Sequence, residues 1–280
     1  MNVLELINLG SNKLKKNKVT SCNLDSEILL SKVLKKTREQ LLVNLDKKIN
    51  NRKINEFNAF IKRRSLKEPV AYILKEKEFW SKKFIINNNT LIPRPETEIL
   101  VDQLVKIYKD KRIFILDIGT GSGCILLSLL TDLKKSKGIG IDISKDALLV
   151  AKKNSMLHKK SGKVKFLKRS LLNFHHNKFD LVVSNPPYIK RNDIKNLKED
   201  IKIYEPKLAL DGGNDGLDLI RKVIYKTNDF LKINGMLALE IGNGQYKKVS
   251  NILVKKKFKI EHIIRDYKEN VRCIISRKIK

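Results

Sequence analysis

The sequence predicts an α/β protein, in which an open, mostly parallel sheet of seven strands is covered by helices and preceded by a small all-helical domain. From residue 93 onward, short apolar runs alternate with helical segments, a pattern typical of a parallel sheet with helices on both faces. Residues 1–69 show helical periodicity alone, and residues 70–92 have the apolar runs and polar turn of a β-hairpin linker. The predicted division of the chain is therefore 1–69, 70–92 and 93–280.

The N-terminal segment contains short amphipathic helices. Apolar side chains recur at helical spacing over residues 4–9 and 28–34, and residues 51–66 form a basic helix with one apolar face. We expect Pro69 to end this last helix, because proline disfavours helical geometry at the residue before it.

The linker and the C-terminal domain supply the strands. In the linker we expect two strands between Phe79 and Ile92, around a polar turn at Asn87–Asn89. The strands expected in the sheet are Ile113–Asp117, Gly138–Asp142, Val164–Leu167, Phe179–Ser184, Met236–Ile241, Lys259–Arg265 and Arg272–Ser276. The helices expected between them are Cys124–Leu130, Lys145–His158, Leu217–Leu231 and Tyr246–Val254. Ligands of open parallel sheets bind beyond the carboxyl ends of the strands, so we expect a site in the loops there.

Composition excludes several classes of protein. With 41% hydrophobic residues the 280-residue chain can bury a core, yet no stretch approaches the ~18 apolar residues of a membrane helix. The start of the chain lacks the basic segment and apolar run of a signal peptide, so we expect a cytoplasmic location. Because Cys22, Cys124 and Cys273 form no Cys-x-x-Cys pair, and the histidines have no zinc spacing, we expect free thiols and no metal.

The formal charge of +30 leaves two interpretations open. It favours a phosphate-rich partner such as RNA or the ribosome. It also fits a compositional bias, since lysines are spread along the whole chain without a dense stripe of arginine and aromatic residues. We expect a weak, non-specific attraction to nucleic acid at most, no membrane partner, and a monomer.

A glycine loop follows the first strand of the predicted sheet. Its spacing is Gly-x-Gly-x-Gly, whereas a dinucleotide fingerprint needs Gly-x-Gly-x-x-Gly. The preceding Asp117 would repel a pyrophosphate but suits a positively charged amino group, and Asp142, after the second strand, can accept hydrogen bonds from ribose hydroxyls. These features favour S-adenosylmethionine over NAD, and the alternative is a plain strand–turn–helix junction with a solvated aspartate. The predicted cofactor residues here are Asp117, Gly119, Thr120, Gly121, Ser122, Gly123 and Asp142.

The tetrapeptide Asn185-Pro186-Pro187-Tyr188 follows the fourth strand, at the same edge as the glycine loop. An amide nitrogen is a poor nucleophile, and a site can help by holding its NH₂ group with two acceptors. The Asn185 side-chain oxygen and the Pro186 carbonyl are suitable, because prolines fix the backbone, while the Tyr188 ring can pack on a flat substrate. We therefore predict Asn185, Pro186 and Tyr188 as catalytic and Asn185–Tyr188 as substrate-binding; the alternative is a proline-rich turn.

Together these residues resemble the release-factor glutamine methyltransferases of the PrmC/HemK family, over nearly the whole chain. Further stretches that carry the resemblance are Ile92-Pro-Arg-Pro-Glu-Thr-Glu98, Tyr204-Glu-Pro-Lys-Leu-Ala-Leu210, Gly212-Gly-Asn-Asp-Gly-Leu217, Leu239-Glu-Ile-Gly-Asn-Gly-Gln245 and Arg265-Asp266. The resemblance implies a Rossmann-like methyltransferase sheet and methylation of the glutamine in the Gly-Gly-Gln loop of peptide-chain release factors. It assigns Gly119–Gly123, Asp142 and Asn185 to S-adenosylmethionine and Asn185–Tyr188 to the substrate, with the N-terminal helices gripping the release factor.

One position departs from the family pattern, because the acidic residue common near the adenine is replaced by Lys168-Arg169-Ser170-Leu171. We expect Ser170 or a neighbouring backbone group to make this contact. Arg94 and Glu96 either close over the ligand or simply begin a helix whose dipole suits acidic residues. Glu205 either orders the loop over the site or caps it.

Two other functions compete with the one that the resemblance implies. The tetrapeptide is shared with methyltransferases that act on amino groups of DNA and RNA bases, and the charge of +30 favours such a substrate. A ribosome-associated binding protein with a vestigial methyltransferase fold is the non-enzymatic alternative. The intact glycine loop and Asn185 oppose the latter.

Overall fold

The computed structural model describes residues 1–176 and 178–279, which form two compact units. The helical unit comprises Met1–Glu76 together with Lys198–Tyr204. The sheet unit comprises Lys77–Leu197 and Glu205–Lys280. Within the described residues, no helix is both long and apolar enough to cross a membrane.

The helical unit packs its helices around an apolar core that includes Leu6, Leu29 and Phe57. The helices are α1 Val3–Lys16, α2 Cys22–Leu34, α3 Arg38–Leu42, α4 Asn51–Ser65 and α5 Val70–Leu74. A glycine allows α1 to approach its neighbours closely, because a Cβ on Gly10 would lie 2.5 Å from the Ser26 hydroxyl and 2.7 Å from the Phe57 ring. Helical periodicity thus predicted this part of the chain correctly.

Two local predictions were wrong. Helix α4 ends at Ser65, before Pro69 can act, and Pro69 instead opens α5. The hairpin joins β1, Glu76–Phe79, to β2, Lys82–Ile85, through Trp80-Ser81 and not through Asn87–Asn89. Both turn residues have positive φ, 54° and 51°, the geometry of a two-residue hairpin turn, although neither is the asparagine or glycine that usually marks it.

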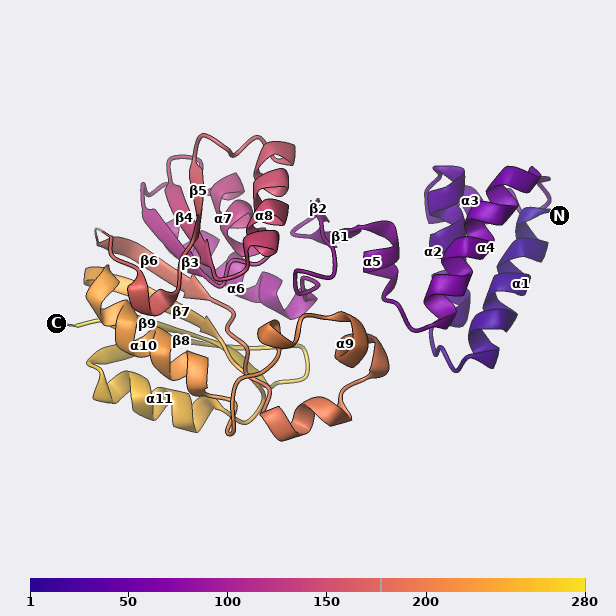
Figure 1. Cartoon of the computed structure of the whole chain (residues 1–280). Coiled ribbons are helices and arrows are strands. Elements are labelled where there is room, and N and C mark those ends of the chain that lie inside the picture. Colours follow the sequence, from indigo (N-terminus) through magenta and orange to yellow (C-terminus); the bar gives the residue numbers. More distant parts are fainter. Residues whose placement is uncertain (177, 280) are drawn as a thin grey trace. The chain divides into compact units, whose positions relative to one another are not determined.

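The sheet unit contains the predicted seven-stranded, mostly parallel sheet (Figure 1). Its strands are β3 Phe114–Ile118, β4 Lys137–Asp142, β5 Val164–Lys168, β6 Phe179–Ser184, β7 Leu231–Glu240, β8 Phe258–Arg265 and β9 Val271–Lys278. They lie in the order β5-β4-β3-β6-β7-β9-β8, and β9 runs antiparallel to both of its neighbours. The principal helices of this unit are α6 Pro95–Tyr108, α7 Cys124–Asp132, α8 Lys145–Leu157, α10 Asp218–Phe230 and α11 Tyr246–Lys255.

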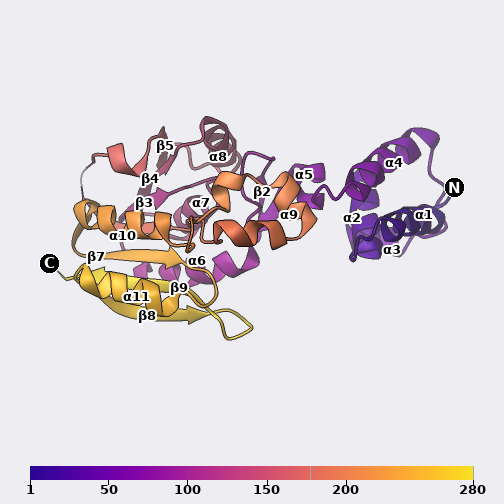
Figure 2. The ribbon, with the colours of Figure 1, turned by 60° about the horizontal axis from the view of Figure 1, so that its bottom comes forward.

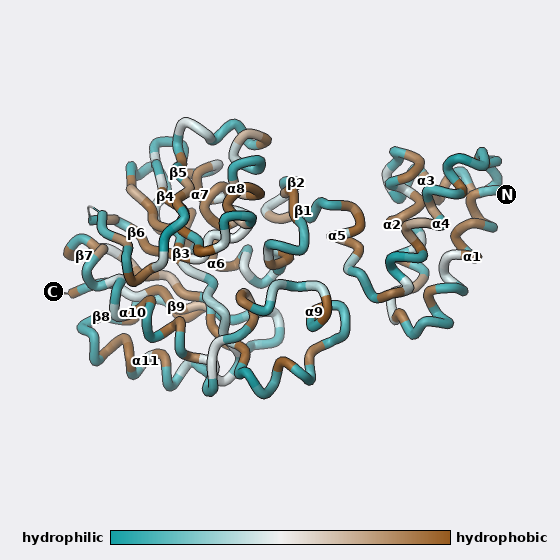
Figure 3. Tube along the Cα trace, in the orientation of Figure 1, coloured by the Kyte–Doolittle hydropathy of each residue, from teal (hydrophilic) through white to brown (hydrophobic). Residues whose placement is uncertain are grey.

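Helices cover both faces of the sheet, which explains why its central strands are apolar throughout (Figures 1 and 2). Along β6, Leu181 and Val183 share a core with α6 and α7, whereas Val182 belongs to the core under α10 and α11. Figure 3 shows α7 and the neighbouring strands as largely hydrophobic. With both faces buried, polar residues gather where the strands end.

The loop predicted between β6 and α10 contains short helical segments. These are η2 Arg191–Asn196, α9 Glu199–Tyr204 and η3 Lys207–Ala209. Within the helical unit, the Tyr204 hydroxyl at the end of α9 donates a hydrogen bond of 2.8 Å to the Leu66 carbonyl.

We predict that Asp25→Ala will lower the free energy of unfolding of the helical unit by about 3–5 kcal/mol, because it leaves a buried charge unpaired. The Asp25 carboxylate accepts a 2.7 Å bond from Arg64, and only 8% and 10% of these side chains are exposed. Glu27→Ala is the matched control on the same helix, since its partner Arg38 is 47% exposed; we expect it to cost less than about 1 kcal/mol. Urea unfolding followed by circular dichroism measures both, and equal effects would contradict this account.

Candidate active site

A cavity of ≈ 420 Å³ lies at the carboxyl ends of the parallel strands. Its walls come from the loops that follow four neighbouring strands: Gly119–Ser122 after β3, Asp142–Ser144 after β4, Arg169–Leu172 after β5 and Asn185–Pro187 after β6. The volume is within the range of small-molecule and cofactor sites. Parallel pairing therefore brings the two sequence motifs to one place.

The glycine loop is held against β4 by its own backbone. The N–H groups of Gly119 and Thr120 donate to the Ile141 carbonyl at 2.9 and 3.0 Å, and the Gly121 N–H donates to the Asp142 carboxylate at 2.9 Å. All three glycines have left-handed φ, of 71°, 55° and 80°, which explains the spacing Gly-x-Gly-x-Gly. A Cβ on Gly119 would meet no atom within 4 Å, so the loop leaves its cavity side open to a ligand.

Asp117 lies beneath this loop and outside the lining of the cavity, with 1% of its surface exposed. The Thr120 hydroxyl donates to its Oδ2 at 2.6 Å, but its Oδ1 accepts no hydrogen bond from the described part of the chain. Burial raises the pKa of Asp117 to about 7, against the opposing effect of the Thr120 hydrogen bond. A buried carboxylate with an orphaned oxygen suits a ligand that brings a positive charge to the loop.

Asp142 has a different environment. Its Oδ2 accepts from Gly121 and its Oδ1 accepts from the Ser144 N–H, both at 2.9 Å, and the residue is half-buried at the cavity wall. Each carboxylate oxygen retains a further lone pair, so both can still accept hydrogen bonds from a ligand. Ser144 caps α8 through its hydroxyl, which accepts from Ala147 at 3.1 Å.

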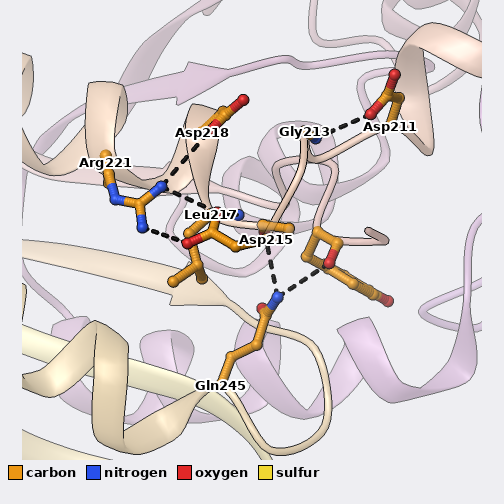
Figure 4. A network of polar contacts seen from close by, with 9 residues as sticks. Asp211, Gly213, Asp215, Leu217, Asp218, Arg221 and Gln245 are labelled. Carbon is orange, nitrogen blue, oxygen red and sulfur yellow. Dashed lines mark hydrogen bonds and ion pairs between the residues drawn. The ribbon is translucent and has the colours of Figure 1, made fainter. Parts of the chain in front are cut away.

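The backbone of the tetrapeptide is fixed by residues far along the chain. Gln245 donates its Nε2 hydrogens to the carbonyls of Tyr188 and Gly216, at 2.9 and 3.1 Å (Figure 4). Its Oε1 accepts from the Gly242 N–H at 2.9 Å. The glycine-rich loop at 212–216 lies directly against the same segment. A Cβ on Gly216 would lie 2.5 Å from the Tyr188 carbonyl, and one on Gly212 would lie 2.9 Å from the Pro187 carbonyl.

Further polar contacts join the loop 211–217 to the first turn of α10. Arg221 pairs with Asp215 and also lies 3.4 Å from Asp218, while the Leu217 N–H donates to Asp215 (Figure 4). These contacts place Gly216 where Gln245 can reach its carbonyl. The two family stretches at 212–217 and 239–245 thus act together as a support for the tetrapeptide.

The Asn185 side chain takes part in a buried chain of hydrogen bonds. Its Nδ2 donates to the Thr97 hydroxyl at 3.3 Å, and that hydroxyl donates to the Glu240 carboxylate at 2.6 Å. The Tyr188 hydroxyl also donates to Glu240, at 3.4 Å. Glu240 is 1% exposed, and its burial raises its pKa above the ordinary value.

Arg94 and Glu205 form an ion pair beside the cavity. Arg94 contacts the Glu205 carboxylate at 2.5 Å, and the Ile92 N–H donates to the other oxygen at 3.2 Å. Glu205 is 4% exposed, whereas Arg94 lines the cavity together with Pro206 and Leu208. Glu205 therefore ties the segment that follows it to the segment before α6, while Glu96 lies in the first turn of α6.

The structure brings most of the predicted site residues to one cavity. The predicted residues in its lining are Gly119, Thr120, Gly121, Ser122, Asp142, Ser170, Asn185, Pro186 and Pro187. Asp117, Gly123 and Tyr188 lie outside the lining. Sequence reasoning missed Thr97, Ile143 and Lys222, and it placed Asn88 and Asn89 in a hairpin turn although they line the cavity. Only Thr97 carried a signal, since it lies within a family stretch.

Known proteins resemble the chain in both parts. Residues 5–74 match the PrmC N-terminal domain and residues 95–214 match the methyltransferase small domain. The catalytic domain of hMettl16 aligns with a TM-score of 0.59 at 15% identity, over 79% of this chain and 82% of that chain. A methyltransferase from Pyrococcus furiosus gives 0.53 at 15% identity, over 70% and 89%. The fold and the matched domain define the sheet unit as a methyltransferase of the Rossmann-like class.

Closer relatives narrow the class to a family. A release factor glutamine methyltransferase of Fusobacterium nucleatum is 38% identical over 98% of this chain and 78% of its own length. Another, from Buchnera aphidicola subsp. Baizongia pistaciae, is 37% identical over 99% of this chain and 100% of its own length. The chain belongs to the release factor glutamine methyltransferase family. A bifunctional methyltransferase of Rickettsia typhi is 35% identical over 97% of this chain, which spans only 56% of that relative.

We predict that Gly216→Ala will lower turnover by about 10- to 100-fold, because its Cβ displaces the Tyr188 carbonyl and shifts the tetrapeptide. Gly244→Ala is the matched control, since its φ of 75° imposes similar strain but its Cβ would meet no atom within 4 Å. We expect the control to retain turnover within about threefold while losing about 1–2 kcal/mol of stability, and Gly216→Ala to lose more stability than that, because its Cβ also meets the Tyr188 backbone. Initial-rate and thermal-unfolding measurements compare them, and equal turnover in the two variants would refute the proposed support.

We predict that Asp117→Asn will remove a pH dependence of stability in the ligand-free protein. The folded-state pKa of about 7 lies above the ordinary 3.8, so the folded protein keeps a proton that the unfolded chain releases. The contribution of protonated Asp117 to the free energy of unfolding is fully present below pH 3.8 and is lost as pH rises to about 7. The melting temperature of the variant relative to wild type should therefore rise between pH 5 and pH 8, and a constant difference would contradict the assignment.

Proposed function

We propose that this chain transfers a methyl group from S-adenosylmethionine to the side-chain amide nitrogen of the glutamine in the Gly-Gly-Gln motif of peptide-chain release factors. One observation carries the proposal: Asn185, Pro186 and Pro187 line the same cavity as the glycine loop. Membership of the family supports the choice of substrate. We further propose that the reaction takes place in the cytoplasm, where translation occurs.

The cofactor site is proposed to consist of the glycine loop, Asp142, and the segment at Ser170. S-adenosylmethionine supplies an electrophilic methyl group when it is bound. Asp117 supports this assignment from below the loop, because a positive amino group nearby would stabilise its ionised form. Asp142 has lone pairs left for ribose hydroxyls, and Ser170 and Leu171 line the cavity beside it, where an adenine would lie.

The proposed catalysis depends on positioning and not on a strong base. The Asn185 oxygen and the Pro186 carbonyl accept the two N–H groups of the substrate amide. This hold turns the nitrogen lone pair toward the methyl group and favours pyramidal nitrogen in the transition state. Methylation would leave the nitrogen strongly acidic, so its proton would pass to water without a base from this chain. Tyr188 would pack its ring against the substrate or steady Asn185 through Glu240.

The helical unit is proposed to recognise the release factor at a distance from the reacting loop. Its match to the PrmC N-terminal domain supports this division of labour. The charge of +30 also favours an acidic partner, and the competing hypothesis of a nucleic-acid substrate rests on the same charge.

Label transfer from S-adenosylmethionine separates these functions. The purified protein is incubated with a release factor, with the same factor carrying Gln→Ala in its Gly-Gly-Gln motif, and with total RNA. Label that enters only the unaltered factor is the expected outcome. Label in RNA alone would establish the nucleic-acid alternative, and no label in any acceptor would overturn the proposed activity.

We predict that Asn185→Ala will lower turnover by ~10²-fold or more, as loss of one preorganised polar contact does at other active sites. Cofactor affinity and the melting temperature should change little, because the glycine loop and the sheet remain intact. Asn192→Ala, an exposed asparagine on the segment that follows, is the matched control and should retain wild-type rates. Rate measurements and calorimetric titration with S-adenosylmethionine test both, and near-full turnover by Asn185→Ala would exclude the assigned role.

A further inference from the structure

Glu240 is a buried carboxylate that enters the proposed mechanism only as a link between Tyr188 and Asn185. It ends β7, and so lies at the same edge of the sheet as the tetrapeptide that follows β6. Two hydroxyl groups reach it, Thr97 at 2.6 Å and Tyr188 at 3.4 Å. On the adjacent strand β9, Cys273 pairs with Glu240 in register, and the neighbouring Arg272 is held by Asp266 at 3.2 Å. Burial raises the pKa of Glu240, whereas its side-chain hydrogen bonds with Thr97, Tyr188 and Asn185 and the positive charge of Arg272 favour the ionised carboxylate.

When Glu240 is ionised, its carboxylate only accepts hydrogen bonds, and this fixes the direction of each hydrogen bond between Glu240, Thr97 and Asn185. The single proton of the Thr97 hydroxyl is committed to Glu240, at the short distance expected of a charge-assisted bond. The Thr97 oxygen can then only accept, so the atom of Asn185 that faces it must be a donor. That atom is Nδ2, at 3.3 Å. The opposite end of the planar carboxamide is the oxygen.

We propose that Glu240 is a positioning residue that turns the Asn185 carboxamide so that its oxygen, and not its NH₂ group, faces the substrate. The inference rests on the proposed function, since it assumes that the substrate presents an NH₂ group. If the Asn185 carboxamide were flipped, its NH₂ group would face the NH₂ group of the substrate, and the two donors could not hydrogen-bond. The site would then have only the Pro186 carbonyl as an acceptor. Glu240 thereby makes the cavity selective for N–H donors without touching the substrate.

The hydrogen bonds that link Glu240 to Asn185 also explain why three separated stretches of sequence carry the family resemblance. Thr97 belongs to the stretch 92–98, Glu240 to the stretch 239–245, and Asp266 holds the Arg272 that lies beside Glu240. All three stretches therefore help to orient the Asn185 carboxamide. A role limited to stability would need no defined direction of the Thr97 hydrogen bond, and this difference can be tested.

Three variants remove, retain or alter the hydrogen bonds that link Glu240 to Asn185. Thr97→Val preserves volume but removes the hydroxyl, Thr97→Ser restores it, and Glu240→Gln gives the buried group both a donor and an acceptor. We expect kcat to fall about 10-fold or more in Thr97→Val and Glu240→Gln, because a charge-assisted bond no longer holds the carboxamide. Thr97→Ser should stay within about threefold of wild type. The Kd for S-adenosylmethionine and the substrate KM should change by less than about threefold throughout.

A double-mutant cycle with Asn185→Ala decides whether Thr97 and Glu240 affect kcat through Asn185. If it does, adding Thr97→Val to Asn185→Ala lowers kcat by no more than about twofold further. Independent, multiplying losses would overturn the proposal, as would a Thr97→Ser variant as slow as Thr97→Val. Wild-type activity on the release factor is measured in parallel, so failure of the proposed function shows separately as an inactive wild-type protein.

A measurement that needs no substrate keeps the proposal testable in that event. The side-chain NH₂ signals of Asn185 are identified by nuclear magnetic resonance as those missing from Asn185→Asp. In wild type these protons should exchange slowly with water, and in Thr97→Val about 10-fold faster or more, because their acceptor is lost. Unchanged exchange in Thr97→Val would show that Nδ2 does not face Thr97 and would sink the inference.

Discussion

The structure depends on how tightly the backbone of residues 185–188 is held at the edge of the sheet. Hydrogen bonds from Gln245 and the close approach of Gly212 and Gly216 leave no room for the segment to shift. The prolines remove most of the remaining backbone freedom. Such rigidity matters for an amide substrate, because an acceptor misplaced by about 1 Å loses much of its effect on the reacting nitrogen.

The two buried carboxylates beside the cavity illustrate opposite solutions to the same physical problem. Burial penalises both, yet Glu240 receives hydroxyl donors at each oxygen and lies near Arg272, whereas Asp117 keeps an orphaned Oδ1. Glu240, whose hydrogen-bond donors come from the protein, is suited to orient a neighbouring side chain. Asp117, which has one oxygen without a donor, is suited to interact with the positive charge of a bound ligand.

The sequence predicted the order of strands and helices in the sheet because apolar runs and glycine-rich turns are local signals. It also located the two motifs that meet in the cavity. It could not predict the hairpin turn at Trp80-Ser81, because neither residue has the backbone preference that marks such turns. Nor could it place Thr97 near Asn185, because the contact spans 88 residues and depends on how α6 enters the sheet unit.

Supporting contacts explain why the family stretches are longer than the ligand contacts require. Gln245 and Gly216 touch the backbone of the tetrapeptide, Glu205 ties the segment that begins at Pro206 to Arg94, and Thr97 reaches Asn185. Each of these residues holds a neighbouring part of the site in place. Oxygen acceptors are common in proteins, but acceptors held in a fixed position are not. In a site that must hold one amide in line with one methyl group, the sequence is therefore constrained more by the residues that support the acceptors than by the acceptors themselves.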